Sequence, residues 1–193
     1  SVLVAGHTAT AAMPPTYNGF TIATTATEIK TLVEATGSGT TAIFLPPGDH
    51  TLDNPVVINR SGSVYIHGSG RIHNTRLIAN DPTQPLFLIE SAAVVNFANL
   101  NLYGTLDSDP DPSSYPPGEG PDLEARAVLM NNTTPVTLEL QFCGVHSGVL
   151  DIKGPGTVRL ESTSMRTNGL SRTGVLVDHP DAEFISISGG YTG

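Results

Sequence analysis

Charged residues are scarce in this sequence, and basic residues are the scarcest of all. Only 14% of the 193 residues are charged, and 9 lysines and arginines stand against 18 aspartates and glutamates, for a net charge of -9. This composition argues against a solvated helical bundle, a coiled coil and a charged disordered tail. Nucleic acids and anionic membranes both require a basic surface, so we expect neither as a partner.

Cysteine, tryptophan and long apolar runs are also missing or nearly so. The single cysteine, Cys143, excludes an internal disulfide and a cysteine metal cluster, and its apolar neighbours predict a buried thiol. No apolar run approaches the roughly 20 residues of a membrane span. The absence of tryptophan removes the best side chain for stacking on a sugar ring, which leaves Tyr103 as a candidate platform.

Glycine and proline, in contrast, are abundant, with 20 and 15 residues. Short apolar runs between turn residues predict an all-β protein of many short strands. We expect these strands at residues 42–45, 56–58, 64–66, 76–78, 86–89, 94–102, 127–130, 136–142, 149–152, 158–160, 175–177 and 184–187.

One helix is predicted, at residues 27–35. Its apolar residues recur at i, i+3 and i+4, Thr25 or Thr27 can cap its start, and Gly37 ends it. Residues 1–26 are small and rich in threonine, and we assign them to an N-terminal extension or edge strand.

An internal repeat distinguishes between a sandwich and a solenoid, the two architectures that fit so many short strands. The segments FLIES (87–91), VLMNN (128–132), VLDIK (149–153) and VLVDH (175–179) are each followed by a second apolar strand, eight or nine residues after the segment begins. The second and third segments start 21 residues apart, and insertions lengthen the other intervals. A repeat of this length predicts one coil of a parallel β-helix, in which neighbouring coils stack at about 4.8 Å.

The first coils resemble a known superfamily. LVEA (32–35), TAIFLPPGDHTL (41–52), VVI (56–58), VYIHGSG (64–70) and TRLI (75–78) together look like the opening of a pectin-lyase-like β-helix. The resemblance covers roughly residues 27–193 and implies a single-stranded right-handed parallel β-helix with three sheets and a short N-terminal capping helix. That superfamily includes polysaccharide lyases, glycoside hydrolases, epimerases, phage tailspikes and adhesins, and the fold does not choose among them.

No closing segment follows the last predicted strand at residues 184–187. An uncapped solenoid exposes a sheet edge and an apolar core. We therefore expect residues 27–193 to form a β-helix domain without its C-terminal cap, as a fragment or part of a longer chain. Self-association or a second polypeptide would cover this end.

The two longest insertions predict a groove. They lie at residues 105–124 and 166–173 and follow the same strand column of the repeat, with only a short turn at residues 144–148 between them. The two loops should therefore lie about 10 Å apart, two coils along the stack. We expect His146 on the floor of the groove and Arg126, Arg166 and Arg172 near its walls, with room for one extended sugar chain.

Candidate catalytic residues follow from the chemistry of polysaccharide cleavage. A lyase needs a base and a cation that neutralises the uronate carboxylate, and His146 with Arg166 could fill these roles. A hydrolase needs two carboxyl groups on either side of the scissile bond. Asp151 and Asp178 are the candidates, with ordinary surface acids as the alternative. The sequence contains no complete lyase or hydrolase motif.

The first insertion is acidic. Asp107, Asp109 and Asp111 alternate within it, and it also carries Asp122, a candidate substrate-binding residue. Alternating carboxylates suit calcium, which binds six to eight oxygens, although the prolines stiffen the loop and the spacing of an EF-hand is missing. A calcium site and a solvated acidic loop both stay open as interpretations. Calcium would also bridge an anionic polymer to this negatively charged chain.

The sequence therefore predicts a secreted or surface protein that processes an extracellular polysaccharide, as a lyase or a glycoside hydrolase, in the groove between the two insertions. The alternative is non-catalytic: a structural β-helix of a phage tail protein, adhesin or surface protein, or a carbohydrate-binding module. The missing motif and the uncapped end favour this alternative. An enzyme, unlike a structural shaft, requires that alanine at His146 or Arg166 abolishes turnover.

Overall fold

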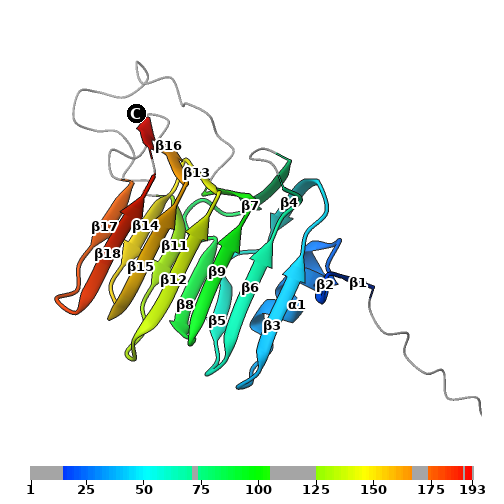
Figure 1. Cartoon of the computed structure of the whole chain (residues 1–193), viewed down its shortest axis with the longest axis horizontal. Helices are drawn as coiled ribbons and strands as arrows, with labels where there is room; N and C mark the ends of the chain where they lie inside the picture. Colours follow the sequence, from blue (N-terminus) through cyan, green and yellow to red (C-terminus); the bar gives the residue numbers. More distant parts are fainter. Residues whose placement is uncertain (1–14, 71–73, 105–124, 167–173, 189, 193) are drawn as a thin grey trace, which may run out of the picture.

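The computed structural model describes residues 15–70, 74–104, 125–166, 174–188 and 190–192. In these residues the chain forms one α-helix and many short strands, which are arranged in three sheets (Figure 1). Within the described ranges the strands pair in parallel, except for the antiparallel pair of β1 with β2. The prediction of an all-β protein is therefore confirmed.

Each sheet is continuous along the molecule. The eight-stranded sheet consists, in order, of β1 (Thr16–Tyr17), β2 (Phe20–Ile22), β3 (Thr40–Phe44), β6 (Ser63–His67), β9 (Val94–Ala98), β12 (Val136–Gln141), β15 (Gly156–Glu161) and β18 (Ala182–Ile187). The six-stranded sheet consists of β19 (Gly190–Thr192), β16 (Ser164–Arg166), β13 (Gly144–His146), β10 (Asn101–Tyr103), β7 (Thr75–Ala79) and β4 (Gly48–Leu52). The five-stranded sheet consists of β17 (Val175–Val177), β14 (Val149–Ile152), β11 (Arg126–Met130), β8 (Phe87–Ser91) and β5 (Val56–Asn59).

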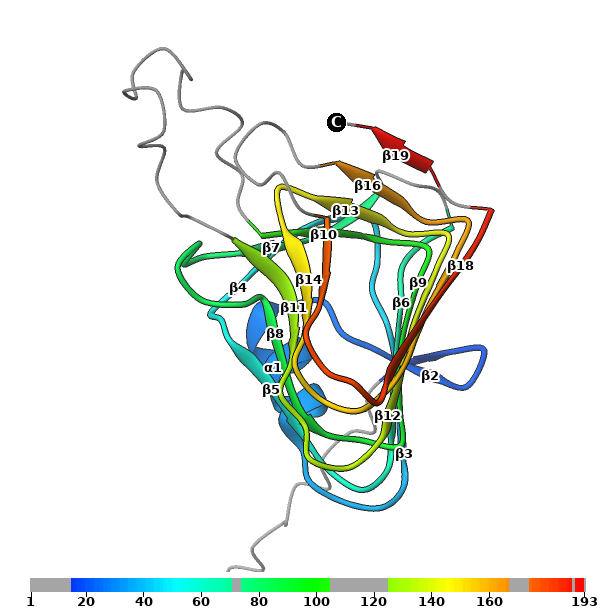
Figure 2. The same ribbon diagram turned by 90° about the vertical axis from the view of Figure 1, so that its left-hand side faces the viewer.

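The chain visits the three sheets in turn. From β3 onward every third strand belongs to the same sheet, and the view along the stack shows the sheets surrounding one interior (Figure 2). Val136 pairs with Gly156, so this pass around the three sheets uses 20 residues. The two strand columns predicted from the repeat are confirmed as β8-β11-β14-β17 and β9-β12-β15-β18.

The core is built from rows of equivalent side chains. In the eight-stranded sheet Val64, Val95, Leu138 and Val158 pair from strand to strand, and all four are fully buried. Because successive side chains of a strand point to opposite faces, the residues that follow them point outward. The outward face therefore presents its own aligned row: Tyr65, Asn96, Glu139 and Arg159.

The helix α1 (Ala26–Glu34) closes one end of the interior. Thr25 is its N-cap and forms a capping box with Glu28, which confirms one of the two caps predicted from the sequence. Ile29 and Val33 are fully buried, and the helix packs against β3, β4 and β5, one strand of each sheet. At 9 residues it is far too short to cross a membrane, and no longer helix occurs in the described chain.

A left-handed residue marks one corner of successive passes around the three sheets. Asn99, Phe142, Ser162 and Ser188 have φ between 48° and 55°, and each directly follows a strand of the eight-stranded sheet. Their backbones extend the ladder beyond the strands, since Asn99 N–H donates to Gln141 O at 3.0 Å. The single strand predicted at residues 94–102 was wrong for this reason: the turn at Asn99 divides it into β9 and β10.

The described part of the N-terminal extension joins the sheet. β1 and β2 form a hairpin, and β2 pairs in parallel with β3. The predicted edge strand is therefore present. The hairpin places the aromatic side chains of Tyr17 and Phe20 beside the next strands of the same sheet. The ring centroids of Phe20 and His67 are 4.6 Å apart.

Candidate functional site

The predicted groove corresponds to one side of the six-stranded sheet. Strand β13 lies between β10 and β16, and these two strands lead into residues 105–124 and 167–173. Both insertions therefore follow strands of one sheet, with β13 and its turn at His146 on the strand between, as the repeat predicted; the groove itself stays a prediction. The insertions themselves lie outside the described residues, and with them Asp107, Asp109, Asp111, Asp122 and Arg172.

Tyr103 and His146 are brought together on the outward face of this sheet. They pair in adjacent strands, and their rings stack with centroids 4.6 Å apart and an interplanar angle of 7°. Arg166 is next in the same row, paired with His146 through the backbone. On the other side of Tyr103, the guanidinium of Arg76 lies 6.0 Å from the ring centroid. Arg76 also donates through Nε and Nη2 to Asp49, so the row places two flat rings beside a guanidinium whose charge is already paired.

The imidazole of His146 is held by a buried amide. Asn101 Nδ2 donates to Thr75 O at 3.5 Å, and its Oδ1 lies 3.2 Å from His146 Nε2. His146 is only 4% exposed. Gly144 makes the arrangement possible, because a Cβ there would lie 2.2 Å from Asn101 Oδ1.

Asp151 and Arg126 form a buried ion pair on the five-stranded sheet. Arg126 Nε donates to Asp151 Oδ2 at 2.8 Å, and Lys153 Nζ lies 3.6 Å from the same oxygen. Asp151 is 1% exposed, and in the outward row it lies between Leu129 and Leu176. Basic groups thus already balance the charge of Asp151. Its other oxygen, Oδ1, is buried and has no hydrogen-bond partner among the described residues.

Asp178 does not join either group. It is exposed and follows β17, at the corner that leads to the eight-stranded sheet, and its N–H donates to Ile152 O at 2.8 Å. His146 lies at the opposite corner, where the chain enters the five-stranded sheet. The structure thus brings together Tyr103, His146 and the backbone of Arg166, and separately Arg126 and Asp151, but it does not place Asp178 beside them.

Two further expectations concern thiol and metal chemistry. Cys143 is buried as predicted, and burial raises the pKa of its thiol to about 12, so it is no nucleophile at neutral pH. Among the described residues, no group of three or more histidines, cysteines, aspartates and glutamates is arranged to hold a metal ion. The calcium prediction concerns the aspartates of residues 105–124 and stays a prediction.

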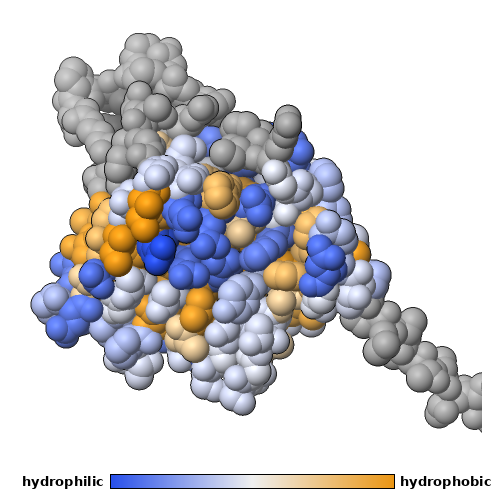
Figure 3. Space-filling view, viewed as in Figure 1, coloured by the Kyte–Doolittle hydropathy of each residue, from blue (hydrophilic) through white to orange (hydrophobic). Residues whose placement is uncertain are grey.

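A second polar and aromatic group was missed by the sequence analysis. On the outward face of the eight-stranded sheet, polar residues gather over the middle strands (Figure 3). Asn96 Nδ2 donates to Glu139 Oε2 at 3.0 Å and to Gln141 Oε1 at 3.2 Å, and Gln141 Nε2 lies 3.4 Å from Glu161 Oε2. The network ends at His67, beside a pocket of about 490 Å³. Its signal in the sequence was the alternation of polar and apolar residues in β6, β9 and β12.

Compared with protein-family models, curated proteins and solved structures, the chain gives no match. What the candidate site does must therefore be argued from its own residues.

Proposed function

We propose that the chain is a single-stranded right-handed parallel β-helix of the pectin-lyase-like kind. Support comes from the strand order, in which three parallel sheets take every third strand, and from the helix that packs against one strand of each sheet. Crossovers between parallel strands of one sheet are right-handed in nearly all proteins. The resemblance of the first coils adds the pectin-lyase-like assignment.

We propose further that the protein binds and processes an extended extracellular polysaccharide along the outward row of the six-stranded sheet. The observation that carries this proposal is the alignment of Tyr103, His146 and Arg166 on successive strands, between the two insertions. A row along the stack matches a linear polymer. The face of Tyr103 suits the C–H face of a sugar ring, and arginine suits the carboxylate of a uronic acid.

Cleavage by a lyase fits the described residues better than cleavage by a hydrolase. A lyase base removes the proton next to the uronate carboxyl group, and the imidazole of His146 is the candidate for this step. A hydrolase would need Asp151 and Asp178 on opposite sides of one bond, whereas Asp151 is paired with Arg126 and Asp178 lies at another corner. Arg172, Asp122 and a calcium ion held by Asp107, Asp109 and Asp111 would complete the substrate contacts.

A non-catalytic role is the second candidate. An imidazole that is 4% exposed, stacked on tyrosine and bonded to asparagine has the environment of a structural histidine. In that case the chain is a shaft of a phage tail protein, adhesin or surface protein, or a carbohydrate-binding module. Both candidates place the protein outside the cell or on a cell or virion surface.

Contact with another chain at the last coil belongs to either candidate. Val177 pairs with Ile152, which is fully buried, yet Val177 is 42% exposed. Self-association or a second polypeptide that covers this coil would bury it. Sedimentation of the full chain over a range of concentrations tests this part of the proposal.

The proposal is tested with a panel of neutral and uronic polysaccharides, with calcium or with a chelator. Reducing ends together with the ultraviolet absorbance of unsaturated uronates identify a lyase, and reducing ends alone identify a hydrolase. Binding is followed in parallel by affinity electrophoresis. If the protein is a lyase, Arg166→Ala and His146→Gln each lower turnover by about 10²–10⁴-fold. Arg159→Ala, on another sheet, is the matched control.

The outcomes separate the candidates. Binding without product, weakened by Tyr103→Ala, supports the carbohydrate-binding module. Neither binding nor product with any polymer contradicts the polysaccharide proposal and leaves the structural shaft. Because His146 and Tyr103 are packed, the circular dichroism and melting temperature of each variant must match the wild type before its activity is compared.

A further inference from the structure

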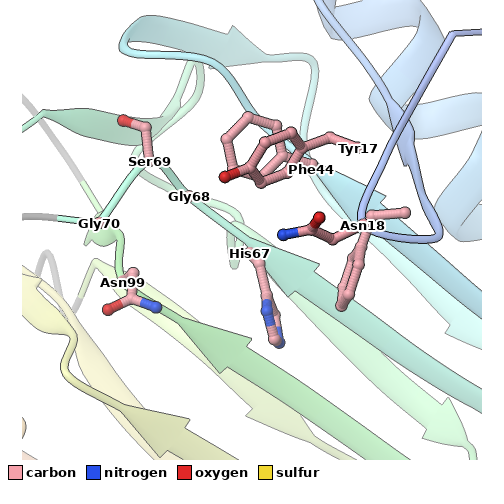
Figure 4. A pocket seen from close by; sticks show the side chains of 9 residues that line it. Tyr17, Asn18, Phe44, His67, Gly68, Ser69, Gly70 and Asn99 are labelled. Carbon is pink, nitrogen blue, oxygen red and sulfur yellow. The ribbon is translucent and has the colours of Figure 1, made fainter.

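The pocket beside His67 is formed between the β1–β2 hairpin and the neighbouring strands of the eight-stranded sheet. It lies where the β1–β2 hairpin meets the edges of β3 and β6, on the outward face of the eight-stranded sheet (Figure 4). Segments that are far apart in the sequence line it, among them Tyr17, Asn18, Phe44, His67, Ser69 and Asn99. This face is distinct from the row of Tyr103 and His146, which belongs to the six-stranded sheet.

Aromatic rings form one part of the lining. The rings of Tyr17 and Phe44 have centroids 4.6 Å apart at an angle of 37°, and those of Phe20 and His67 are 4.6 Å apart at 35°. Tyr17 is 51% exposed although it lies against Phe44. An apolar ring face that borders a pocket in this way can take the C–H face of a small ligand.

Unpaired amides form the other part. Asn18 lies on one side of the pocket and Asn99 and Ser69 on the other (Figure 4). The side chains of Asn18 and Asn99 make no hydrogen bond to another residue in the part of the chain that the structure describes. Both have left-handed backbones, with φ of 49° and 55°, which fix the direction in which their side chains leave the turn. Each amide offers two donors and an acceptor to a ligand.

His67 contributes as a neutral group with a fixed orientation. Asn96 Nδ2 donates to Glu139 and Gln141, so Asn96 Oδ1 accepts the Nε2 proton of His67 at 3.0 Å. Burial lowers the pKa of His67, and the bond to Asn96 offsets this only in part. Among the residues that the structure describes, the pocket lining therefore contains no charged side chain at neutral pH.

We propose that this pocket binds one uncharged sugar ring of a neutral saccharide. Ring faces for C–H groups, amides for hydroxyl groups and the absence of charge are the recognition chemistry of a neutral sugar. A uronate would find no cation among the described lining residues, and the net charge of -9 disfavours it further. The volume of about 490 Å³ lies in the range of small-ligand pockets.

Tyrosine fluorescence of the full chain gives a direct test, since no tryptophan obscures it. The probes are neutral hexose oligosaccharides with glucose, galactose or mannose ends, and a galacturonate oligomer for comparison. We expect a neutral oligosaccharide to change the emission and to show saturation transfer in NMR. Tyr17→Phe should remove much of the optical signal but keep the affinity measured by calorimetry.

Binding variants then locate the ligand. Tyr17→Ala should weaken binding roughly three- to tenfold, as expected for the loss of one ring contact. Asn18→Gly removes an amide at a position whose backbone glycine adopts readily, and it should also weaken binding. Phe142→Asn is the matched control: Phe142 is 50% exposed with φ of 53°, but it lies outside the pocket.

The proposal is overturned if no neutral saccharide binds, if only the uronate oligomer binds, or if Tyr17→Ala and Asn18→Gly both bind like the wild type. Tyr103→Ala distinguishes this site from the polysaccharide row. It should leave binding of the neutral sugar unchanged, whatever it does to the polymer.

Discussion

At the residue scale, the absence of a side chain at Gly144 permits the contact between Asn101 and His146. Asn101 and His146 meet across its backbone, and a Cβ there would lie 2.2 Å from the asparagine oxygen and 2.6 Å from the histidine nitrogen. Neither atom can retreat without breaking the hydrogen bond that joins them. The stacked pair of Tyr103 and His146 therefore depends on Gly144, which contributes no side chain to the stack.

We expect Gly144→Ala to destabilise the protein by about 1–3 kcal/mol, the usual consequence of leaving a buried polar group without its partner. Urea denaturation measures the change. Gly39→Ala is the matched control, because no atom lies within 4 Å of a Cβ at that position. Equal stability of the two variants would show that the Asn101–His146 bond contributes nothing.

His67 gives the stability of the protein a defined pH dependence. Burial disfavours its charged form and lowers its pKa in the folded state. Its contribution is complete above the unfolded pKa of about 6.5 and is lost as the pH falls from there toward the folded value. We expect an imidazole resonance that is absent in His67→Gln to titrate below pH 6.5. A midpoint at or above 6.5 would contradict the assigned environment.

At the scale of elements, the sequence predicts best what carries a long apolar pattern. From β8 onward, the strands of the five- and eight-stranded sheets were predicted from their repeat, β3, β5 and β6 from their apolar runs, and the helix from its cap and spacing. In the six-stranded sheet β4 was missed, and so were β13 and β16, in which only the central of three residues, Val145 or Met165, faces the core. A single apolar residue leaves no periodicity to recognise.

The register in which β11 pairs with β14 also differs from the one that the sequence repeat predicts. The repeat equates Val128 with Val149, whereas the structure pairs Val128 with Leu150. An irregularity between Arg126 and Val128 shifts the pairing by one residue. The same irregularity separates Arg126, whose guanidinium reaches Asp151, from the regular part of β11. Sequence comparison sees the repeat but not such a local shift.

The capping box of α1 supplies a test at this scale. Glu28 Oε2 accepts the N–H of Thr24 at 2.8 Å and that of Thr25 at 3.0 Å, and these bonds lower its pKa. We expect Thr25→Ala to cost about 1 kcal/mol, because the cap of the helix is lost. Thr31→Ala, in the exposed part of the same helix, should change stability by less than about 0.5 kcal/mol. A denaturation series compares the two, and equal losses would argue against a capping role.

At the scale of the whole molecule, the stacking of coils brings together residues that the sequence keeps apart. The pocket beside His67 combines residues 17–20, Phe44, residues 67–70 and Asn99. Neither a motif nor a repeat links these positions, so only the folded stack reveals them. The shared strand column of the two insertions was accessible from the sequence because both interrupt the same repeat, whereas the groove between them stays a prediction.

In the proposed β-helix, stability should also differ along the stack, because each coil gains support only from its neighbours. Leu138 is fully buried in the middle of the eight-stranded sheet, whereas Leu176 lies on the last coil and is 38% exposed. We expect Leu138→Ala to cost about 2–5 kcal/mol and to accelerate amide exchange on both sides of β12. Leu176→Ala should accelerate exchange in β17 and β18 alone. Uniform acceleration by both variants would show a single cooperative unit.

The left-handed corner also bears on how such a chain can lengthen in evolution. Asparagine, phenylalanine and serine occupy equivalent positions at Asn99, Phe142, Ser162 and Ser188, so the bend is preserved while the residue that makes it changes. Each coil therefore carries its own bend and requires only inward apolar side chains from its neighbours. A tandem gene duplication of 20 codons, such as those for residues 136–155, would add a coil that enters in register and lengthens the molecule by about 4.8 Å. Length in such a chain can evolve separately from the chemistry on its faces.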